Sequence, residues 1–284
     1  MAILVDMSAV QGIGWTAILG RYSLEKSYMP ILSTSLSNPD KGLEETAKND
    51  HTDLIEYFVS QGANNWEWGM RGAAEGGHMD LVKYFVSKGA NIWKWGMCGA
   101  ARGGHMDLVK YFVSQGANEW NRGMRQAAEG GHMGIVEYFI SQGAYAWNGG
   151  MRGAARGGHM DLVLYFVSKG ANDWNEGMCQ ATQGGHMDLV LYFVSQGAND
   201  WDMSMCHAAA EGHMGLVKYL FSEGVNANPG VNVNLCMCLA AFRGYMDIVM
   251  FLVSKGANDW QESMHFATYS NHKKLIEFFK SKIN

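Results

Sequence analysis

The chain has 284 residues, of which 48% are hydrophobic and 17% charged, so it can bury a sizeable core and lacks the composition of a disordered protein. Its formal net charge of −5 argues against a nucleic-acid partner, because surfaces that bind phosphates are usually basic. Glycine is abundant and proline rare, with 36 and 3 residues, which indicates one structural position that is used many times.

The five cysteines are an odd number and include no CxxC pair, a pattern that fits free thiols better than a secreted disulfide framework. We therefore expect a reducing intracellular compartment, the cytoplasm, with the nucleus as the open alternative. No apolar run reaches the ~18 residues of a membrane-spanning helix, so no membrane partner is expected. Residues 1–5 are apolar, but Asp6 follows them and no Lys or Arg precedes them, which argues against a signal peptide.

Residues 1–38 do not match the rest of the chain, and we expect them to form an N-terminal cap or arm. Residues 39–284 are periodic. Histidines recur every 27 residues until Tyr245, which takes the equivalent place after 32, and His272 follows after another 27. Nine repeats with one five-residue insertion indicate a repeat protein. The regular histidines before the insertion are His51, His78, His105, His132, His159, His186 and His213.

The second repeat illustrates the local pattern. Met70, Ala73 and Ala74 have the spacing of one helical face, in a short helix that Gly69 opens. Gly76-Gly77 breaks that helix, and residues 79–87 have the apolar pattern of a second one. Gly89 is placed for a left-handed cap at its end. Two helices this short do not bury both faces alone, so stacking between repeats must supply the core.

Four short motifs recur in register through the array: Ala73-Ala74, Gly77-His78, Leu81-Val82 and Gly89-Ala90-Asn91. They resemble the ankyrin repeat, whose unit has about 33 residues. The residues missing here lie where that family has its β-hairpin finger. The resemblance implies an all-α solenoid of nine helix pairs with mostly truncated fingers. The short, near-identical repeats are also similar to the ankyrin arrays that large DNA viruses encode.

Between Gly224 and Met237 the spacing grows by five residues. Residues 225–235 include Val and Asn in alternation around a Pro-Gly pair, which predicts a finger-like hairpin. The Trp of the other repeats is absent, with Asn228 at its place. The insertion either carries function, through residues such as Asn228 and Val231, or is a relic of a full-length repeat.

Two kinds of tryptophan occur. One recurs in register and is expected to form a buried hydrophobic ladder that covers the edge left by the missing fingers. Trp68 and Trp95 occupy a second position that later repeats fill with other residues, so they are candidate partner contacts. The regular tryptophans are Trp66, Trp93, Trp120, Trp147, Trp174, Trp201 and Trp260.

The sequence predicts no metal, cofactor or catalytic residue. Equivalent histidines in stacked repeats lie about 8–10 Å apart, whereas zinc ligands must converge at about 2 Å. A hydrogen bond across the turn between the two helices is the expected role. The one local cluster that looks metal-like comprises Cys206, His207, Cys236 and Cys238, and its spacing matches no zinc family.

Comparing repeats within the chain separates the scaffold from the candidate binding surface. The second helix is repetitive on its surface, whereas the first helix varies at the places of Arg71 and Glu75. In ankyrin arrays this face lines the concave groove that binds partners. The candidate contacts are Trp68, Arg71, Glu75, Trp95, Arg102, Arg122, Arg125, Glu129, Arg152, Arg156, Asn228, Val231, Phe242 and Tyr269.

These observations predict a non-catalytic, monomeric protein-binding module whose partner is a protein. An enzyme would need acid, base or nucleophilic groups that converge in a pocket, and the sequence offers no such set. Two alternatives stay open: a self-assembling structural scaffold, and a substrate adaptor for a ubiquitin ligase, as in some viral ankyrin proteins.

Overall fold

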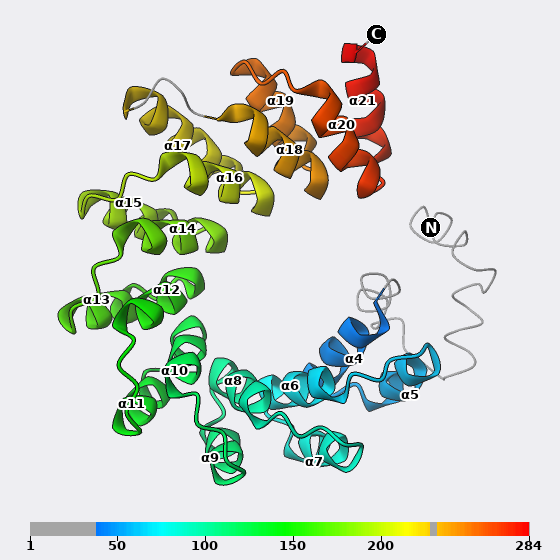
Figure 1. Ribbon diagram of the computed structural model, residues 1–284, viewed down its shortest axis with the longest axis vertical. Helices are drawn as coiled ribbons and strands as arrows, with labels where there is room; N and C mark the ends of the chain where they lie inside the picture. The colour runs from blue at the N-terminus through cyan, green and yellow to red at the C-terminus, as the bar shows by residue number, and fades with distance from the viewer. Residues whose placement is uncertain (1–37, 228–231, 284) are drawn as a thin grey trace. The chain divides into compact units, whose positions relative to one another are not determined.

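The computed structural model describes residues 38–227 and 232–283, and within these ranges the fold is all-α, with eighteen helices and no strand. The helices alternate as first and second members of nine pairs (Figure 1). The predicted all-α array of nine helix pairs is therefore confirmed. No helix in the described ranges has the length and apolar character needed to cross a membrane.

The chain divides into two compact parts, Met1–Tyr145 and Ala146–Asn284. The helices of the first part are α4 (Pro39–Lys48), α5 (Thr52–Ser60), α6 (Trp66–Gly76), α7 (Met79–Ser87), α8 (Trp93–Gly103), α9 (Met106–Ser114), α10 (Trp120–Glu129) and α11 (Met133–Ser141). Those of the second are α12 (Trp147–Gly157), α13 (Met160–Ser168), α14 (Trp174–Gly184), α15 (Met187–Ser195), α16 (Trp201–Glu211), α17 (Met214–Ala227), α18 (Val233–Arg243), α19 (Met246–Ser254), α20 (Trp260–Tyr269) and α21 (Lys273–Ile283).

Most helices end where the sequence predicts, but the first helices start earlier than expected and α17 runs past its expected end. The first helix of the second repeat starts at Trp66, three residues before the expected Gly69, because Asn65 caps it by accepting the Trp68 N–H. Gly77, in the left-handed region at φ 85°, ends it. Gly89 ends the second helix in the same way at φ 111°, as predicted.

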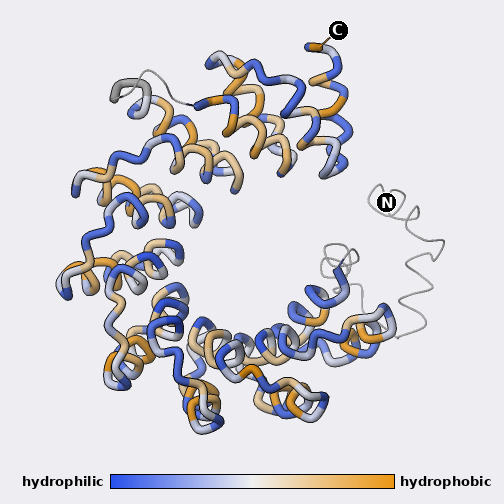
Figure 2. Tube along the Cα trace, viewed as in Figure 1, coloured by the Kyte–Doolittle hydropathy of each residue, from blue (hydrophilic) through white to orange (hydrophobic). Residues whose placement is uncertain are grey.

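The core lies between the two helices of each pair and between adjacent first helices. Met70, Ala73, Ala74, Val82 and Phe85 are all fully buried, and their equivalents are buried in every other pair except the last, where Met264 and Ile276 are half-buried and Thr268 is exposed. Figure 2 shows hydrophobic residues along the helices and hydrophilic ones in most of the segments that join successive pairs. A pair of nine- to eleven-residue helices is stable only because its neighbours complete this core.

Where the structure describes the connection between successive pairs in full, it is a short loop rather than a β-hairpin finger, and a side chain braces most of these loops. Asn148, the second residue of α12, accepts the backbone N–H groups of Asn172 at 2.8 Å and Asp173 at 3.2 Å, just before α14. We call this bond to the next loop the loop clasp. It satisfies backbone donors that a finger would otherwise pair. Its acceptors are Asp40, Glu67, Asn121, Asn148, Asn175 and Asn234.

The histidines make the predicted kind of bond, but their partner lies in the preceding repeat. His105 Nε2 is 3.1 Å from the carbonyl oxygen of Glu75, near the end of α6, and because a carbonyl only accepts, the imidazole donates. We call this bond the histidine clasp. The His105 ring also packs against Gly77, where an added methyl group would clash with it. No cluster that could hold a metal ion occurs in the described ranges.

Each regular tryptophan is the first residue of its helix and is half-buried, so the expected hydrophobic ladder is only partly buried. Trp66 and Trp120 contact the buried phenylalanine of their own pair, with ring centroids 6.5 Å from Phe85 and 6.3 Å from Phe139. They therefore cover the end of the pair that faces the short loop. The loop clasp, rather than the tryptophan alone, compensates for the missing finger.

The hairpin predicted at 225–235 is wrong for the described part of that stretch. Residues 225–227 continue α17, and residues 233–235 belong to α18. In the second repeat, Gly89 and the buried Ala90 end the second helix. In the seventh repeat, Val225 stands at the place of Ala90, and Gly224, at the place of Gly89, stays helical. Since Val233 begins α18, it takes the tryptophan place assigned to Asn228. Asn228 and Val231 lie outside the described residues.

Candidate functional site

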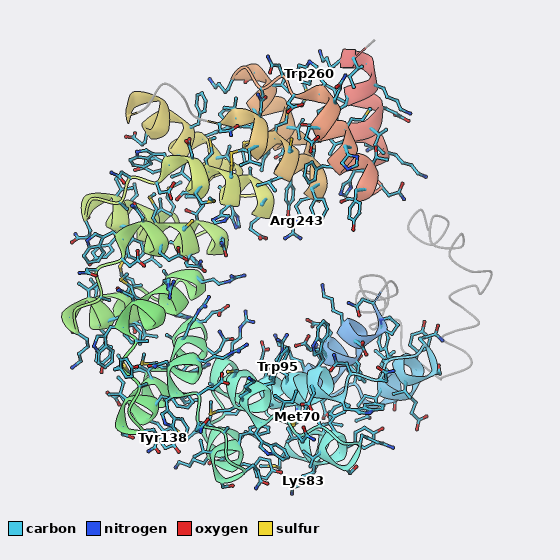
Figure 3. All side chains as sticks on the ribbon, viewed as in Figure 1. Met70, Lys83, Trp95, Tyr138, Arg243 and Trp260 are labelled. Carbon is cyan, nitrogen blue, oxygen red and sulfur yellow. A yellow bond between two sulfur atoms is a disulfide. The ribbon has the colours of Figure 1, made fainter. Side chains whose placement is uncertain are left out.

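The candidate site is the exposed face of the first helices, which carries the variable residues. Arg71 and Glu75 are four residues apart on α6, so their side chains lie on one side of that helix. Equivalent residues of adjacent first helices contact one another across 27 positions of sequence, as Arg71 does with Glu44. Figure 3 shows Trp95 in the row of first helices, whereas Lys83 projects from α7. The face is continuous within each compact part.

In the N-terminal part this face is a ladder of paired charges. Lys48 Nζ donates to Glu75 Oε1 at 2.8 Å, and Arg102 Nη2 lies 3.0 Å from Glu129 Oε1. Arg102 Nε also lies 3.9 Å from Glu75 Oε1. Pairs of opposite charge therefore join adjacent first helices in this part. Each such pair contributes about 0–1 kcal/mol at a surface, so the ladder aligns the helices more than it stabilises them.

Trp95 is held beneath an arginine rather than freely exposed. The guanidinium carbon of Arg71 lies 5.5 Å from the centre of the Trp95 ring, which is a cation–π contact. Arg71 Nε also donates to Glu44 Oε1 at 2.6 Å. Burial raises the pKa of Glu44, and the neighbouring Arg71 opposes this rise. Trp68 is likewise half-buried, so the two tryptophans do not form an open aromatic patch.

The arginines of α10 are less completely paired. The Arg122 side chain is 54% exposed, and its Nη1 lies 3.9 Å from Glu119 Oε2. Arg125 Nε is buried and has no hydrogen-bond partner in the described ranges. On α12, in the C-terminal part, Arg152 Nε has the same property, while its Nη1 lies 3.9 Å from Glu176 Oε1. The exposed end of Arg122 is therefore the most accessible of these guanidinium groups, whereas the Nε–H groups of Arg125 and Arg152 are buried.

Arg156, on the same helix as Arg152, donates to Gln183 Oε1 at 2.9 Å and stays exposed. Gln183 also lies beside His207, its Nε2 being 3.3 Å from His207 Nδ1. The Cys179 Sγ is 2.9 Å from the same nitrogen. Burial raises the pKa of Cys179 to about 12, and burial likewise lowers the pKa of His207. The pair is thus a neutral thiol beside a neutral imidazole, the opposite of an activated thiolate.

Cys206 on α16 and Cys236 on α18 form a disulfide, so the expectation of five free thiols is wrong. Cys98, Cys179 and Cys238 are free and buried. The two bonded cysteines stand at different places in their repeats, equivalent to Arg71 and Gly69. Because the repeat period relates only equivalent places, it did not predict this pair, which the packing of α16 on α18 brings together. The argument for a reducing compartment rested on five free thiols and loses that support.

Aromatic side chains replace the charges at the end of the face. Phe242 of α18 and Tyr269 of α20 stack with ring centroids 6.1 Å apart, and Tyr269 is 80% exposed. Phe266 meets Phe242 edge-on at 6.2 Å. Arg243 Nη2, beside this cluster in sequence, lies 3.4 Å from Glu211 Oε1. Figure 3 shows Arg243 at the opposite end of the first helices from Trp260. A ring as exposed as Tyr269 stabilises little and is available to a partner.

Sequence reasoning considered His207 only as part of a metal-like cluster and missed Phe266; both occupy the place of Gly72. The signal was present, because that place holds glycine or glutamine in repeats two to six and the larger His207, Leu239 and Phe266 in the last three. It also missed two leucines on the second helices. Leu164 and Leu191 are 47% and 46% exposed where α7 carries Lys83. The charged side chains of the ladder meet one another within the N-terminal part, and Phe242 meets Tyr269 within the C-terminal part.

The fold and this face define an all-α repeat protein built of stacked helix pairs. No protein-family model matches the sequence, and neither does any curated protein. Among solved structures, the chain is similar to the ankyrin repeat domain of human ASB11, with 18% identity and a TM-score of 0.42 over 64% of this chain and 96% of that chain. A likeness at that level assigns neither family nor function.

Proposed function

We propose that the chain is a non-catalytic protein-binding module of the ankyrin type, which contacts a protein partner along the exposed face of its first helices. Tyr269 carries the proposal. It is 80% exposed, follows Phe242 on the variable face, and replaces the charged residues that pair with one another in the N-terminal part. Exposed aromatic residues are frequent anchors of protein interfaces.

Arginines extend the proposed contact surface. Arg122, Arg125 and Arg152 have donors that their carboxylate neighbours do not fully occupy. The paired residues Arg71, Glu75, Arg102 and Glu129 contribute the rigid frame, with Trp68 and Trp95 at its edge. Arg156, Asn228 and Val231 belong to the proposed surface as well. Such a face suits a partner that combines an apolar anchor with acidic side chains.

The test compares an exposed tyrosine on the proposed face, Tyr269, with an exposed tyrosine outside it, Tyr145. The full chain is immobilised, proteins captured from native cells are quantified by mass spectrometry, and Tyr269→Ala is compared with Tyr145→Ala. Tyr145 is 72% exposed but lies in the loop before α12, off the proposed face. We expect Tyr269→Ala alone to lose partners at an unchanged melting temperature. Equal capture by both variants would overturn the assignment of this face.

The same preparation separates the alternatives. Light scattering of the purified chain should give the mass of a monomer, whereas a self-assembling scaffold would grow with concentration. If ubiquitin-ligase subunits are captured by the wild type and are still captured by Tyr269→Ala, the adaptor function is favoured. Retention on heparin that weakens with salt would indicate nucleic-acid binding instead, which the net charge of −5 argues against.

A further inference from the structure

The junction between α16 and α18 differs from the other junctions of the C-terminal part. From α12 to α14, from α14 to α16 and from α18 to α20, each neighbouring pair is joined by a loop clasp and a histidine clasp. Both clasps are hydrogen bonds between one repeat and the next. At the α16–α18 junction the described residues make neither of them.

The loop clasp is missing because the loop itself has changed. Asp202 stands at the place of Asn148 and Asn175, but its Oδ1 is buried without a hydrogen-bond partner in the ranges described. Counted along the chain, its partners would be residues 226 and 227, which belong to α17; counted back from the start of α18, they would be residue 231, which lies outside the described residues, and Asn232. A backbone N–H inside a helix is already bonded within that helix and does not serve the clasp.

The histidine clasp is missing because Tyr245 stands at the histidine place. Its phenol packs over Gly212, where a methyl group would lie 2.6 Å from Cζ. The phenol makes no side-chain hydrogen bond to the described residues, whereas His213 and His272 bond carbonyl oxygens at 3.2 and 3.0 Å. Among the described residues, two regular bonds are therefore absent at this junction.

The Cys206–Cys236 disulfide joins α16 and α18 at this same junction. We propose that it is a redox clasp, which replaces the two missing hydrogen-bonded clasps, so that its oxidation state sets how firmly α18–α21 are coupled to α12–α17. This inference concerns the scaffold and goes beyond the proposed binding function. In a linear array, each repeat depends on its neighbours alone, so weakening one junction frees the pairs beyond it.

Reduction balances as an ordinary thiol–disulfide exchange. Two thiols of a small reductant transfer two electrons and two protons, the bond between Cys206 and Cys236 breaks, both become thiols, and the reductant becomes a disulfide. Cys206 is 2% and Cys236 0% exposed, so the reductant reaches them only when the junction opens. Other contacts remain after reduction, including the Phe221–Phe251 ring pair at 5.9 Å and the Arg243–Glu211 ion pair.

The experiment uses the full chain after treatment with glutathione disulfide, with or without subsequent dithiothreitol. Maleimide labelling after denaturation should count three thiols in the oxidised chain and five in the reduced one. Hydrogen exchange should become about tenfold or more faster in α18–α21 on reduction, which corresponds to about 1.4 kcal/mol. Exchange in α12–α15 should stay unchanged.

Two variants complete the test. Cys206→Ala/Cys236→Ala should show the fast exchange of α18–α21 with or without reductant, and Cys238→Ala should retain the redox difference of the wild type. Five reactive thiols in the oxidised chain would overturn the proposal. So would equal exchange of α18–α21 in both states, or an increase spread evenly over residues 146–283. The wild-type comparison decides these points even if the double variant does not fold.

Discussion

Gly69 lies flat against the ring of Phe85, so closely that a methyl group on Gly69 would stand 2.5 Å from Phe85 Cε1. The first helix therefore reaches the second only because this side chain is absent. In six repeats the two places hold glycine and phenylalanine. In the seventh and eighth the phenylalanine is Leu220 or Leu252, and the glycine is Ser204 or Cys236. The ninth repeat, with Ser263 and Phe279, keeps the larger ring and breaks the rule.

This relationship predicts opposite effects for two glycines of one repeat. Gly123→Ala should destabilise the fold by about 1–3 kcal/mol through overpacking, because its methyl group would meet the Phe139 ring at 2.5 Å. Gly134→Ala, on α11 with nothing within 4 Å, should stabilise it by about 0.5–1 kcal/mol through helix propensity. Urea unfolding measures both. The second substitution Phe139→Leu should recover part of the Gly123→Ala loss, and a pair of neutral single variants would contradict the close packing.

The loop clasp predicts a loss at one junction and a gain at another. Asn148→Ala removes the acceptor of two N–H groups and should cost about 1–3 kcal/mol, since those donors are left without it. Asn148→Asp should be tolerated, because Asp40 serves the same role in the first repeat.

Lys94 stands at the place of Asn148 in the third repeat. A lysine side chain cannot accept a hydrogen bond from the loop, and its Nζ lies 3.1 Å from Glu119 Oε1 instead. Lys94→Asn should therefore add a clasp and stabilise by about 0.5–1.5 kcal/mol. Thermal unfolding of Asn148→Ala, Asn148→Asp and Lys94→Asn checks the argument, and destabilisation by Lys94→Asn would count against it.

The regular tryptophans should be worth less than fully buried ones. Trp120→Ala removes a half-buried ring that contacts Phe139 at a centroid distance of 6.3 Å, so we expect a loss of about 1–3 kcal/mol, below that of a fully buried tryptophan. Tyr145→Ala, at 72% exposure, is the control and should change stability by about 0.5 kcal/mol at most. Differential scanning calorimetry of both variants measures the difference, and equal melting temperatures would show that the tryptophan row is not structural.

His207 should make the stability of the chain fall as the solution becomes acidic. Burial lowers its pKa below 6.5, an effect that Glu176, Glu211 and Asp200 oppose and Arg156 supports. Between the lowered pKa and 6.5 the unfolded chain binds more protons than the folded one, so stability is fully present above pH 6.5 and is lost as pH falls through the folded pKa.

His207→Gln should remove that part of the pH dependence, because an amide side chain does not titrate. The fold should tolerate the glutamine, since Gln126 and Gln180 occupy the same place in other repeats. Urea unfolding of both proteins from pH 7.5 down to pH 5 measures it. Identical slopes for the variant and the wild type would show that His207 is not the group responsible.

The sequence alone determined the all-α class, the nine pairs and most helix ends. These features are local, since a 3.6-residue apolar pattern and a glycine at a left-handed cap act within a few residues of chain. The charge ladder was equally predictable, because a strict 27-residue period states which residues of stacked repeats become neighbours. Phe242 and Tyr269, at the same repeat place, were found for the same reason.

Tertiary structure decided what falls outside that period. Cys206 and Cys236 are 30 residues apart and occupy different repeat places, so their bond followed only from how closely α16 packs on α18. The histidine clasp also spans 30 residues, and the loop clasp 24, so neither followed from the repeat length. At 225–235 the alternation of Val and Asn predicted strands, but α17 continued through residues 225–227 and α18 began at Val233. A strand needs a partner strand for its backbone groups, whereas a helix satisfies them within itself.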